Sequence, residues 1–221
     1  GVGVCEGIAK TVKCLCDALG IWCMIALSGN NPEKGIKYRH TWNIVRICKS
    51  YYHLDATFDN SLGRNYSHAS DIASDSGNAG TTHGDIAQHP IPGNKKSGKK
   101  GSASTRIRYD YFNLDDKQIF RDHEPLIAPA PACTDSAHSY YKEKKLSFAK
   151  TEDVYRRALQ AAKKEKPLTF HWKGGYLTRS VLDELLAQIT KAGTERQKMP
   201  CISLNWPQAV LHVEYVANPQ Q

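Results

Sequence analysis

The sequence predicts a mixed α+β fold, and three observations carry this prediction. Helical periodicity near the start of the chain gives way to an uninterrupted apolar run. Two segments rich in aromatic and β-branched residues follow, which is typical of strands. Beyond about residue 150, helical and strand patterns alternate again. We therefore expect a helix packed on an antiparallel sheet, followed by a small C-terminal α/β accessory domain.

The first helix is predicted from about Cys5 to Leu19, with Gly20 as its C-terminal stop. Its apolar residues recur at helical spacing and predict one buried stripe, made of Ile8, Val12, Leu15 and Leu19. Cys5 then falls in or just before the first turn. Unpaired backbone N–H groups and the positive end of the helix dipole favour an anion there, so we expect a lowered thiol pKa. The same N–H groups are suited to stabilising an oxyanion.

Three strands are predicted next, over residues 21–27, 38–47 and 51–58. The link at Cys48 and Lys49 is short enough for a hairpin. If the loop consists of these two residues, His40 lies opposite Thr57 and Asp55 is its diagonal neighbour on the same face. Diagonal neighbours lie about 7–8 Å apart at the backbone, which histidine and aspartate side chains can bridge. Any loop of even length keeps this parity.

A thiol, an imidazole and a carboxylate in this order are the parts of a nucleophile, its base and the group that orients the base. We assign these roles to Cys5, His40 and Asp55. The alternative for an isolated cysteine is a small packed hydrophobe, which is our interpretation of Cys14, Cys16 and Cys23. His53 is a rival base on the same strand face, and we interpret it instead as an exposed or packed strand residue.

The motifs around these residues resemble the transglutaminase-like superfamily of papain-like cysteine enzymes, in its bacterial branch. The resemblance rests on three segments: Gly3-Val4-Cys5-Glu6-Gly7, His40-Thr41-Trp42-Asn43 and Asp55-Ala56-Thr57. A later run from Tyr109 to Asp115 and the triplet Arg121-Asp122-His123 resemble the segment that closes the domain in these proteins. Thr41 departs from the alanine that is usual there. The resemblance covers roughly residues 1–125.

The resemblance implies a transglutaminase-like, papain-like core in which the helix carrying the cysteine packs on an antiparallel sheet. It implies a cysteine protease, amidase or transglutaminase-like enzyme acting on a peptide or protein substrate through Cys5, His40 and Asp55. We favour hydrolysis, because nothing in the sequence marks an amine-acceptor site or a calcium loop. The alternative is a non-catalytic peptide-binding or scaffolding module that retains the triad. Family domains carry helices before the cysteine, so we expect this sequence to be a fragment and assign the activity to its parent protein.

We expect the core to span residues 1–125, with a flexible insertion at 64–105 that has almost no apolar residues to bury. A linker or arm follows at 126–150, and the accessory domain spans 151–221. Further elements are predicted as a strand at 106–112, a strand or extended arm at 139–148, a helix at 151–164, a strand at 168–172, a helix from Ser180, and a hairpin of 201–204 with 209–216.

The composition is that of an ordinary globular protein, with 40% hydrophobic and 24% charged residues. No apolar run is long enough to span a bilayer. The net charge of +8 comes partly from lysines in the insertion, and without interleaved aromatics we expect no nucleic-acid partner. Seven cysteines leave at least one unpaired, which favours a cytoplasmic location over the cell envelope or secretion. We expect no cofactor and no metal, since Cys133 and His138 are too isolated for a zinc signature.

Overall fold

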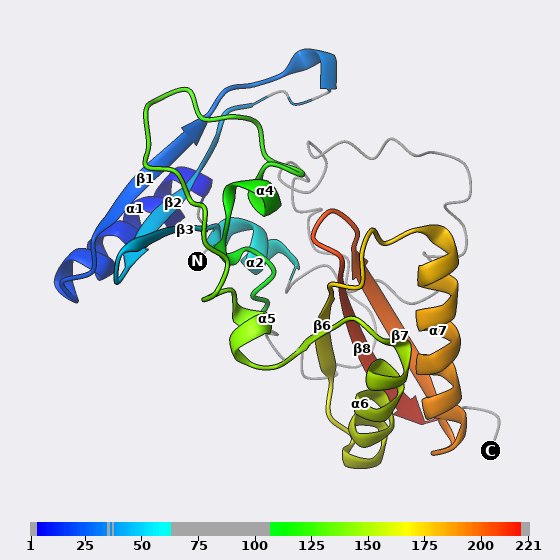
Figure 1. Ribbon diagram of the computed structural model, residues 1–221. Helices are drawn as coiled ribbons and strands as arrows, with labels where there is room; N and C mark the ends of the chain where they lie inside the picture. The colour runs from blue at the N-terminus through cyan, green and yellow to red at the C-terminus, as the bar shows by residue number, and fades with distance from the viewer. Residues whose placement is uncertain (1–3, 35, 37, 63–106, 218–221) are drawn as a thin grey trace, which may run out of the picture. The chain divides into compact units, whose positions relative to one another are not determined.

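The computed structural model describes residues 4–34, 36, 38–62 and 107–217, and this part of the chain folds as a mixed α+β protein (Figure 1). It divides into two compact units. Among the described residues, unit 1 comprises 4–62 and 107–139, and unit 2 comprises 140–217. The predicted flexible insertion at 64–105 lies outside the described residues.

Unit 1 is built on a four-stranded sheet of order β1-β2-β3-β4, in which every neighbouring pair is antiparallel. Its elements are α1 (Cys5–Ala18), β1 (Cys23–Ser28), a short 3-10 turn (Pro32–Lys34), β2 (His40–Ile47), β3 (Ser50–Leu54), α2 (Ala56–Leu62), β4 (Phe112–Leu114) and α4 (Asp116–Ile119). The strand predicted at 106–112 is therefore wrong in position, because pairing begins only at Phe112, where β4 meets Leu54.

The hairpin between β2 and β3 has the predicted two-residue loop, since Ile47 pairs with Ser50 across it. Cys48 adopts a left-handed backbone with φ of 54°, which primed hairpin turns require and which residues other than glycine and asparagine seldom supply. The predicted register is therefore confirmed over residues 43–47 and 50–54, but His40 does not pair with Thr57, which lies in α2.

The strand after this loop is shorter than predicted, because β3 ends at Leu54 instead of continuing to Phe58. Asp55 ends it by capping α2: its Oδ1 accepts hydrogen bonds from the backbone N–H groups of Thr57 at 2.8 Å and Phe58 at 3.1 Å. A side-chain acceptor that satisfies the first N–H groups of a helix stabilises the helical conformation over the extended one. This cap was not predicted from the sequence, because Asp55 lies inside an aromatic-rich segment that is typical of a strand.

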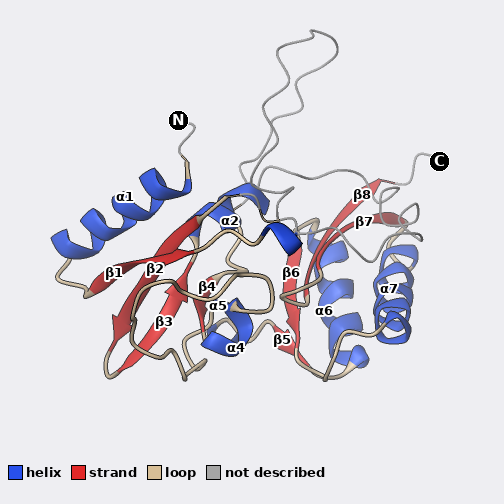
Figure 2. Cartoon of the chain, turned by 90° about the horizontal axis from the view of Figure 1, so that it is seen from above, coloured by secondary structure: helices blue, strands red, loops and turns tan. Residues whose placement is uncertain are grey.

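Helix α1 lies along one face of the unit 1 sheet (Figure 2). Asn43 of β2 is buried, and its Nδ2 donates to the carbonyl oxygen of Ala9 at 3.0 Å, which ties the helix to the sheet. Ala9 is the buried residue of this helix. The predicted buried stripe is wrong at its C-terminal end, since Leu15 is 59% and Leu19 is 73% exposed.

The opposite face of this sheet carries a hydrophobic cluster centred on Trp42 and Ile44, both fully buried. Phe58 of α2 and Ile119 of α4 pack against it. Because side chains alternate along β2, Trp42 and His40 share this face while Asn43 points towards α1. The strand thus carries the helix on one side and the cluster on the other.

Unit 2 has a four-stranded sheet of order β5-β6-β8-β7, antiparallel except for the parallel pair of β5 and β6. Its elements are α5 (Tyr140–Glu143), β5 (Ser147–Phe148), α6 (Thr151–Lys164), β6 (Leu168–Trp172), α7 (Arg179–Thr194), β7 (Lys198–Asn205) and β8 (Val210–Ala217). The elements predicted beyond residue 150 are all present. The segment predicted as one strand or arm at 139–148 instead contains a helical turn before its short strand.

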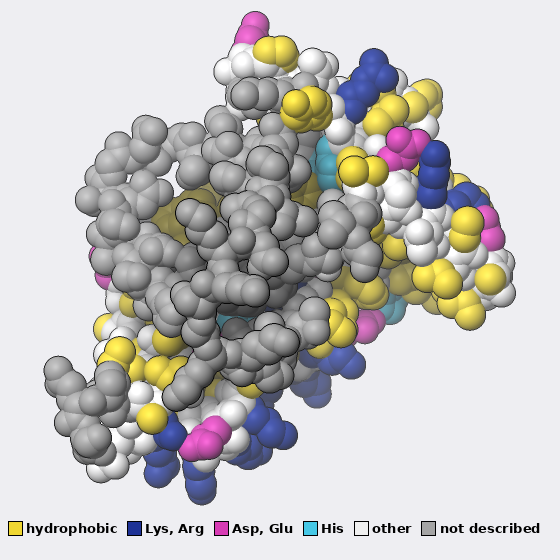
Figure 3. Space-filling view, turned by 180° about the vertical axis from the view of Figure 1, so that it is seen from behind, with side chains coloured by type: hydrophobic (Ala, Val, Ile, Leu, Met, Phe, Trp, Pro, Cys, Tyr) yellow, Lys and Arg dark blue, Asp and Glu magenta, His cyan; other side chains and the backbone are white. Residues whose placement is uncertain are grey.

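Large apolar side chains remain exposed around α1 and the turn that follows it, namely Leu15, Leu19, Ile21 and Trp22. Hydrophobic side chains are visible at the surface on the side of unit 1 where this helix lies (Figure 3). Within the described residues, the structure contains no helix with the length and apolar character needed to cross a membrane.

Asn43→Asp should lower the free energy of unfolding by about 1–3 kcal/mol, because it removes a buried donor and sets a carboxylate against the Ala9 carbonyl oxygen. Denaturant unfolding followed by circular dichroism measures this change. Arg46→Ala, at an exposed position of the same strand, is the matched control and should stay within about 0.5 kcal/mol of the parent. Equal effects of the two changes would contradict the role of Asn43 in holding α1.

Candidate active site

Cys5 is the first residue of α1, as the sequence predicts, and its thiol is partly accessible. A hydrogen bond with His40 is the largest cause that lowers the pKa of this thiol. Burial acts in the opposite direction, whereas the charge of His40 and the backbone N–H groups of Thr41 and Glu6 lower the pKa further. The sulfur therefore lies where both an imidazole and a helix start stabilise a thiolate.

His40 begins β2 and connects the thiol to Asp55. Its Nε2 lies 2.5 Å from Oδ2 of Asp55, which leaves Nδ1 for the thiol. Burial alone would lower the pKa of His40, but the charge and hydrogen bond of Asp55, with help from Cys5, raise it to about 9. The ring also stacks on Trp42, with centroids 5.6 Å apart. This environment favours a thiolate–imidazolium pair at neutral pH.

Asp55 is fully buried, and its two oxygens have separate partners. Oδ1 caps α2, whereas Oδ2 faces His40. Burial alone would raise the pKa of this carboxyl, but the charge of His40 and the hydrogen bonds from His123 and His40 hold it well below its ordinary value. Asp55 is thus a buried carboxylate that fixes the orientation of the imidazole. The structure brings all three predicted residues together in the predicted order.

Asp59 lies one helical turn after Asp55 and behaves in the opposite way. It is buried and accepts a hydrogen bond from the backbone N–H of Tyr111 at 3.0 Å. Burial, followed by repulsion from Asp110 and Asp55, raises the pKa of Asp59 well above its ordinary value. The pKa values of two neighbouring carboxyls are therefore shifted in opposite directions, which favours the charged form of Asp55 and the neutral form of Asp59.

His53 is fully buried and belongs to a separate network. Its Nδ1 accepts a hydrogen bond from Nε1 of Trp42 at 2.9 Å, and its Nε2 lies 2.8 Å from Oδ1 of Asp116. Burial lowers the pKa of His53, outweighing the effect of Asp116. The ring is thus a packed residue behind the indole, in agreement with the strand interpretation.

His123 is a residue that the sequence reasoning did not assign to the site. Its Nε2 lies 2.9 Å from the same Oδ2 of Asp55 that faces His40. The Arg121-Asp122-His123 triplet was noted in the sequence only as part of a domain-closing segment. Its 68-residue separation from Asp55 explains why no local pattern placed it there.

Two groups in the described part of the chain contain ligand atoms close enough to suit a metal ion: His40 with Asp55 and His123, and His53 with Asp116 and Cys133. Two ligands of one ion, each at about 2.1 Å, lie about 3 Å or more apart. The 2.5 Å between His40 and Asp55 is shorter than this and fits a charge-assisted hydrogen bond. In the second group, Trp42 occupies Nδ1 of His53, so Nε2 carries the proton and has no lone pair to offer.

The seven cysteines are all free thiols. Cys23 and Cys133 are buried, and burial is the leading cause that raises the pKa of each to about 12. Cys14, which we predicted to be packed, is exposed, as is Cys48. The exposed position of Cys14 follows from the poor burial of the C-terminal half of α1.

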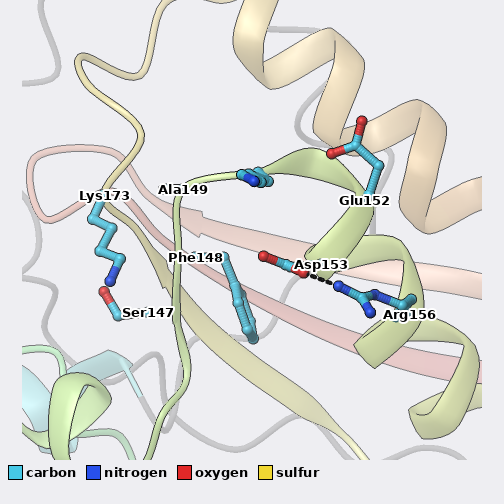
Figure 4. Close-up of a pocket in the computed structure, with 8 residues that line it drawn as sticks. Ser147, Phe148, Ala149, Glu152, Asp153, Arg156 and Lys173 are labelled. Atoms are coloured by element: carbon cyan, nitrogen blue, oxygen red, sulfur yellow. Dashed lines mark hydrogen bonds and ion pairs between the residues drawn. The ribbon is translucent and has the colours of Figure 1, made fainter.

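A separate open pocket lies in unit 2, between β5 and the start of α6, with a volume of about 490 Å³ (Figure 4). Lys150, Lys173 and Arg156 contribute basic groups to its lining. Arg156 forms an ion pair with Asp153, which also lines the pocket, so part of this charge is already compensated.

Asp55→Asn should lower the pKa of His40 from about 9 towards the ordinary histidine value, because the imidazolium loses its counter-charge. The alkylation of Cys5 at neutral pH should become slower for the same reason. Asparagine still caps α2, so the loss should be chemical and not a failure to fold. Alkylation rates across pH, with thermal unfolding as the folding check, measure this.

Asp59→Asn is the matched control, since asparagine resembles the neutral acid. Its alkylation profile should be unchanged. The pKa of Asp59 is higher in the folded protein than in the unfolded chain. The parent therefore loses stability as the pH rises from the pKa of the unfolded chain towards the pKa of the folded protein. The variant should therefore be at least as stable as the parent at pH 7. Equal loss of Cys5 reactivity in both variants would contradict the assignment of Asp55.

No protein-family model and no curated protein matches this chain. The chemical interpretation of the site consequently depends on the geometry of Cys5, His40 and Asp55 and on the sequence motifs that contain them.

Proposed function

We propose that Cys5, His40 and Asp55 form the catalytic triad of a transglutaminase-like cysteine acyl-transfer enzyme that hydrolyses peptide or carboxamide bonds. One observation carries the proposal: the imidazole at the start of β2 interacts with two groups, the thiol at the start of α1, whose pKa it lowers, and the buried carboxylate after β3, to which it is hydrogen-bonded. The lowered pKa of Cys5, the raised pKa of His40 and the lowered pKa of Asp55 each favour the charged form that nucleophilic catalysis uses.

In the proposed reaction, the Cys5 thiolate attacks the carbonyl carbon and a C–S bond forms. The negative charge moves to the carbonyl oxygen, which backbone N–H groups at the helix start are suited to stabilise. The imidazolium of His40 then donates its proton to the leaving nitrogen as the C–N bond breaks. The products of this half-reaction are a thioester on Cys5, a free amine or ammonia, and a neutral imidazole.

Water completes the proposed cycle. His40, now neutral, removes a proton from water, and the resulting hydroxide attacks the thioester carbonyl. Breaking the C–S bond releases a carboxylic acid and regenerates the thiolate and imidazolium. Throughout the cycle Asp55 holds the Nε2 side of the ring and stabilises its charged form, so that the Nδ1 side stays directed at the reacting groups.

Asn43 and Trp42 support this geometry from the two faces of β2. Asn43 fixes α1, and therefore the position of Cys5, through Ala9. Trp42 stacks on His40 and limits the rotation of the imidazole. Both residues belong to the motif that begins with His40, which gives a physical reason for their presence beside the base.

Cys5 should react with iodoacetamide at pH 6 about 10- to 100-fold faster than the exposed thiols of Cys14 and Cys48, because its lowered pKa gives it a larger thiolate fraction at a pH where an ordinary thiol is almost wholly protonated. Mass spectrometry of peptides after brief alkylation gives all three rates in one sample. His40→Ala should remove most of the advantage of Cys5.

His53→Gln is the matched histidine control, since it keeps an amide able to face Trp42 and Asp116 and should leave the Cys5 rate nearly unchanged. A Cys5 rate no higher than those of the two reference thiols would refute the enzyme proposal and leave a peptide-binding or scaffolding module. A larger effect of His53 than of His40 would show that the base is wrongly assigned.

A further inference from the structure

His123 is buried between two carboxylates. Its Nε2 lies 2.9 Å from Oδ2 of Asp55, and its Nδ1 lies 2.8 Å from Oδ1 of Asp122. The side chains of His123 and Asp122 are 1% and 3% exposed, and that of Asp55 is fully buried. The hydrogen-bonded groups of the site thus extend from Asp55 to His123 and Asp122.

The partners of His123 indicate its protonation state. A neutral imidazole would turn one nitrogen lone pair towards a carboxylate oxygen, which is repulsive, whereas an imidazolium donates from both nitrogens. Burial alone would lower the pKa of His123, but hydrogen bonds and charges from Asp122 and Asp55 outweigh it and raise the pKa. The ring therefore carries a positive charge inside unit 1.

The surrounding groups hold this ring rigidly. The hydroxyl of Tyr111 donates to Oδ2 of Asp122 at 2.6 Å, which fixes the carboxylate that faces Nδ1. Trp42 meets the ring edge-on with centroids 4.9 Å apart, and Phe58 lies 4.7 Å away. A rigid cation that is hydrogen-bonded through both ring nitrogens and lies beside Asp55 is the arrangement expected of a group that orients the carboxylate.

We propose that His123, held by Asp122, is a positioning residue that keeps Asp55 ionised and aimed at His40, and that its positive charge limits how basic His40 becomes. This inference rests on the proposed function of Cys5, His40 and Asp55. His40 and His123 donate to the same oxygen of Asp55, so the hydrogen bond from each ring weakens the hydrogen bond from the other ring.

Among the residues that the structure describes, several ionisable groups surround His123. Asp55 and Asp122 are its direct partners, His40 has its ring centroid 5.3 Å away, and His53 senses the charge of His123 more weakly. Charge alternates from the thiolate through His40, Asp55 and His123 to Asp122. Asp122 contacts the ring nitrogen of His123 that does not face the oxygen shared with His40, so neutralising Asp122 and His123 together removes mainly repulsion from His40.

Asp122→Asn tests this with little change of shape. An asparagine amide donates to Nδ1, so His123 loses that proton but still donates from Nε2 to Asp55. Histidine carrying ¹³C in its rings allows His40 and His123 to be followed across pH by NMR. In Asp122→Asn, His123 should be neutral at pH 7. The pKa of His40 should rise, which corresponds to a fall of about threefold or more in its acid dissociation constant.

Asp116→Asn is the matched control, because it makes the same change beside the other buried histidine, His53. It should leave the titration of His40 unchanged. An unchanged or lowered pKa of His40 in a folded Asp122→Asn variant would overturn the proposal. A purely structural role of His123 predicts reduced stability without a rise in the pKa of His40.

The unsubstituted protein supplies a test that no folding defect can obscure. Its His123 ring should be an imidazolium at pH 7, where an ordinary histidine is mostly neutral. A neutral ring there would overturn the proposal. The outcome is separable from that of the proposed function: slow alkylation of Cys5 would refute the enzyme, whereas the NMR titrations judge His123 by itself.

Discussion

The site depends on one buried carboxylate. Asp55 ends β3, starts α2 and orients His40 with a side chain that has no exposed surface. Each role uses a different oxygen, so the backbone cap and the imidazole contact do not compete. Taking a carboxylate out of water is costly unless hydrogen bonds and opposite charges replace the lost solvation. The capped helix and the surrounding imidazoles provide that replacement.

Strand β2 distributes the rest of the site between the two faces of the sheet. Its odd-numbered residue Asn43 fixes the helix that carries Cys5, and its even-numbered residues His40 and Trp42 face the buried cluster. A shift of one residue in the register of β2 would exchange these faces and separate the thiol from its base. The pairing of Ile47 with Ser50 at the tight loop holds that register.

The sequence was sufficient to predict the local parts of this site. Helix start, strand parity and loop length are short-range properties, and they predicted the position of Cys5 at the start of α1 and the contact of His40 with Asp55. The predicted contact of Asp55 with His40 is present, although through a capping aspartate after the strand and not through a continued strand. Periodicity could not show that Leu15 and Leu19 stay exposed, since it identifies an apolar face without identifying what covers it.

The number of residues that separate contacting side chains in the sequence affects the order in which the site assembles. The bond between His40 and Asp55 closes a segment of 15 residues, whereas the bond between His123 and the same oxygen closes 68. The longer closure costs about 1.3 kcal/mol more chain entropy. During folding, Asp55 should therefore meet His40 within the hairpin first, and the second imidazole should arrive only when the later segment docks onto the sheet.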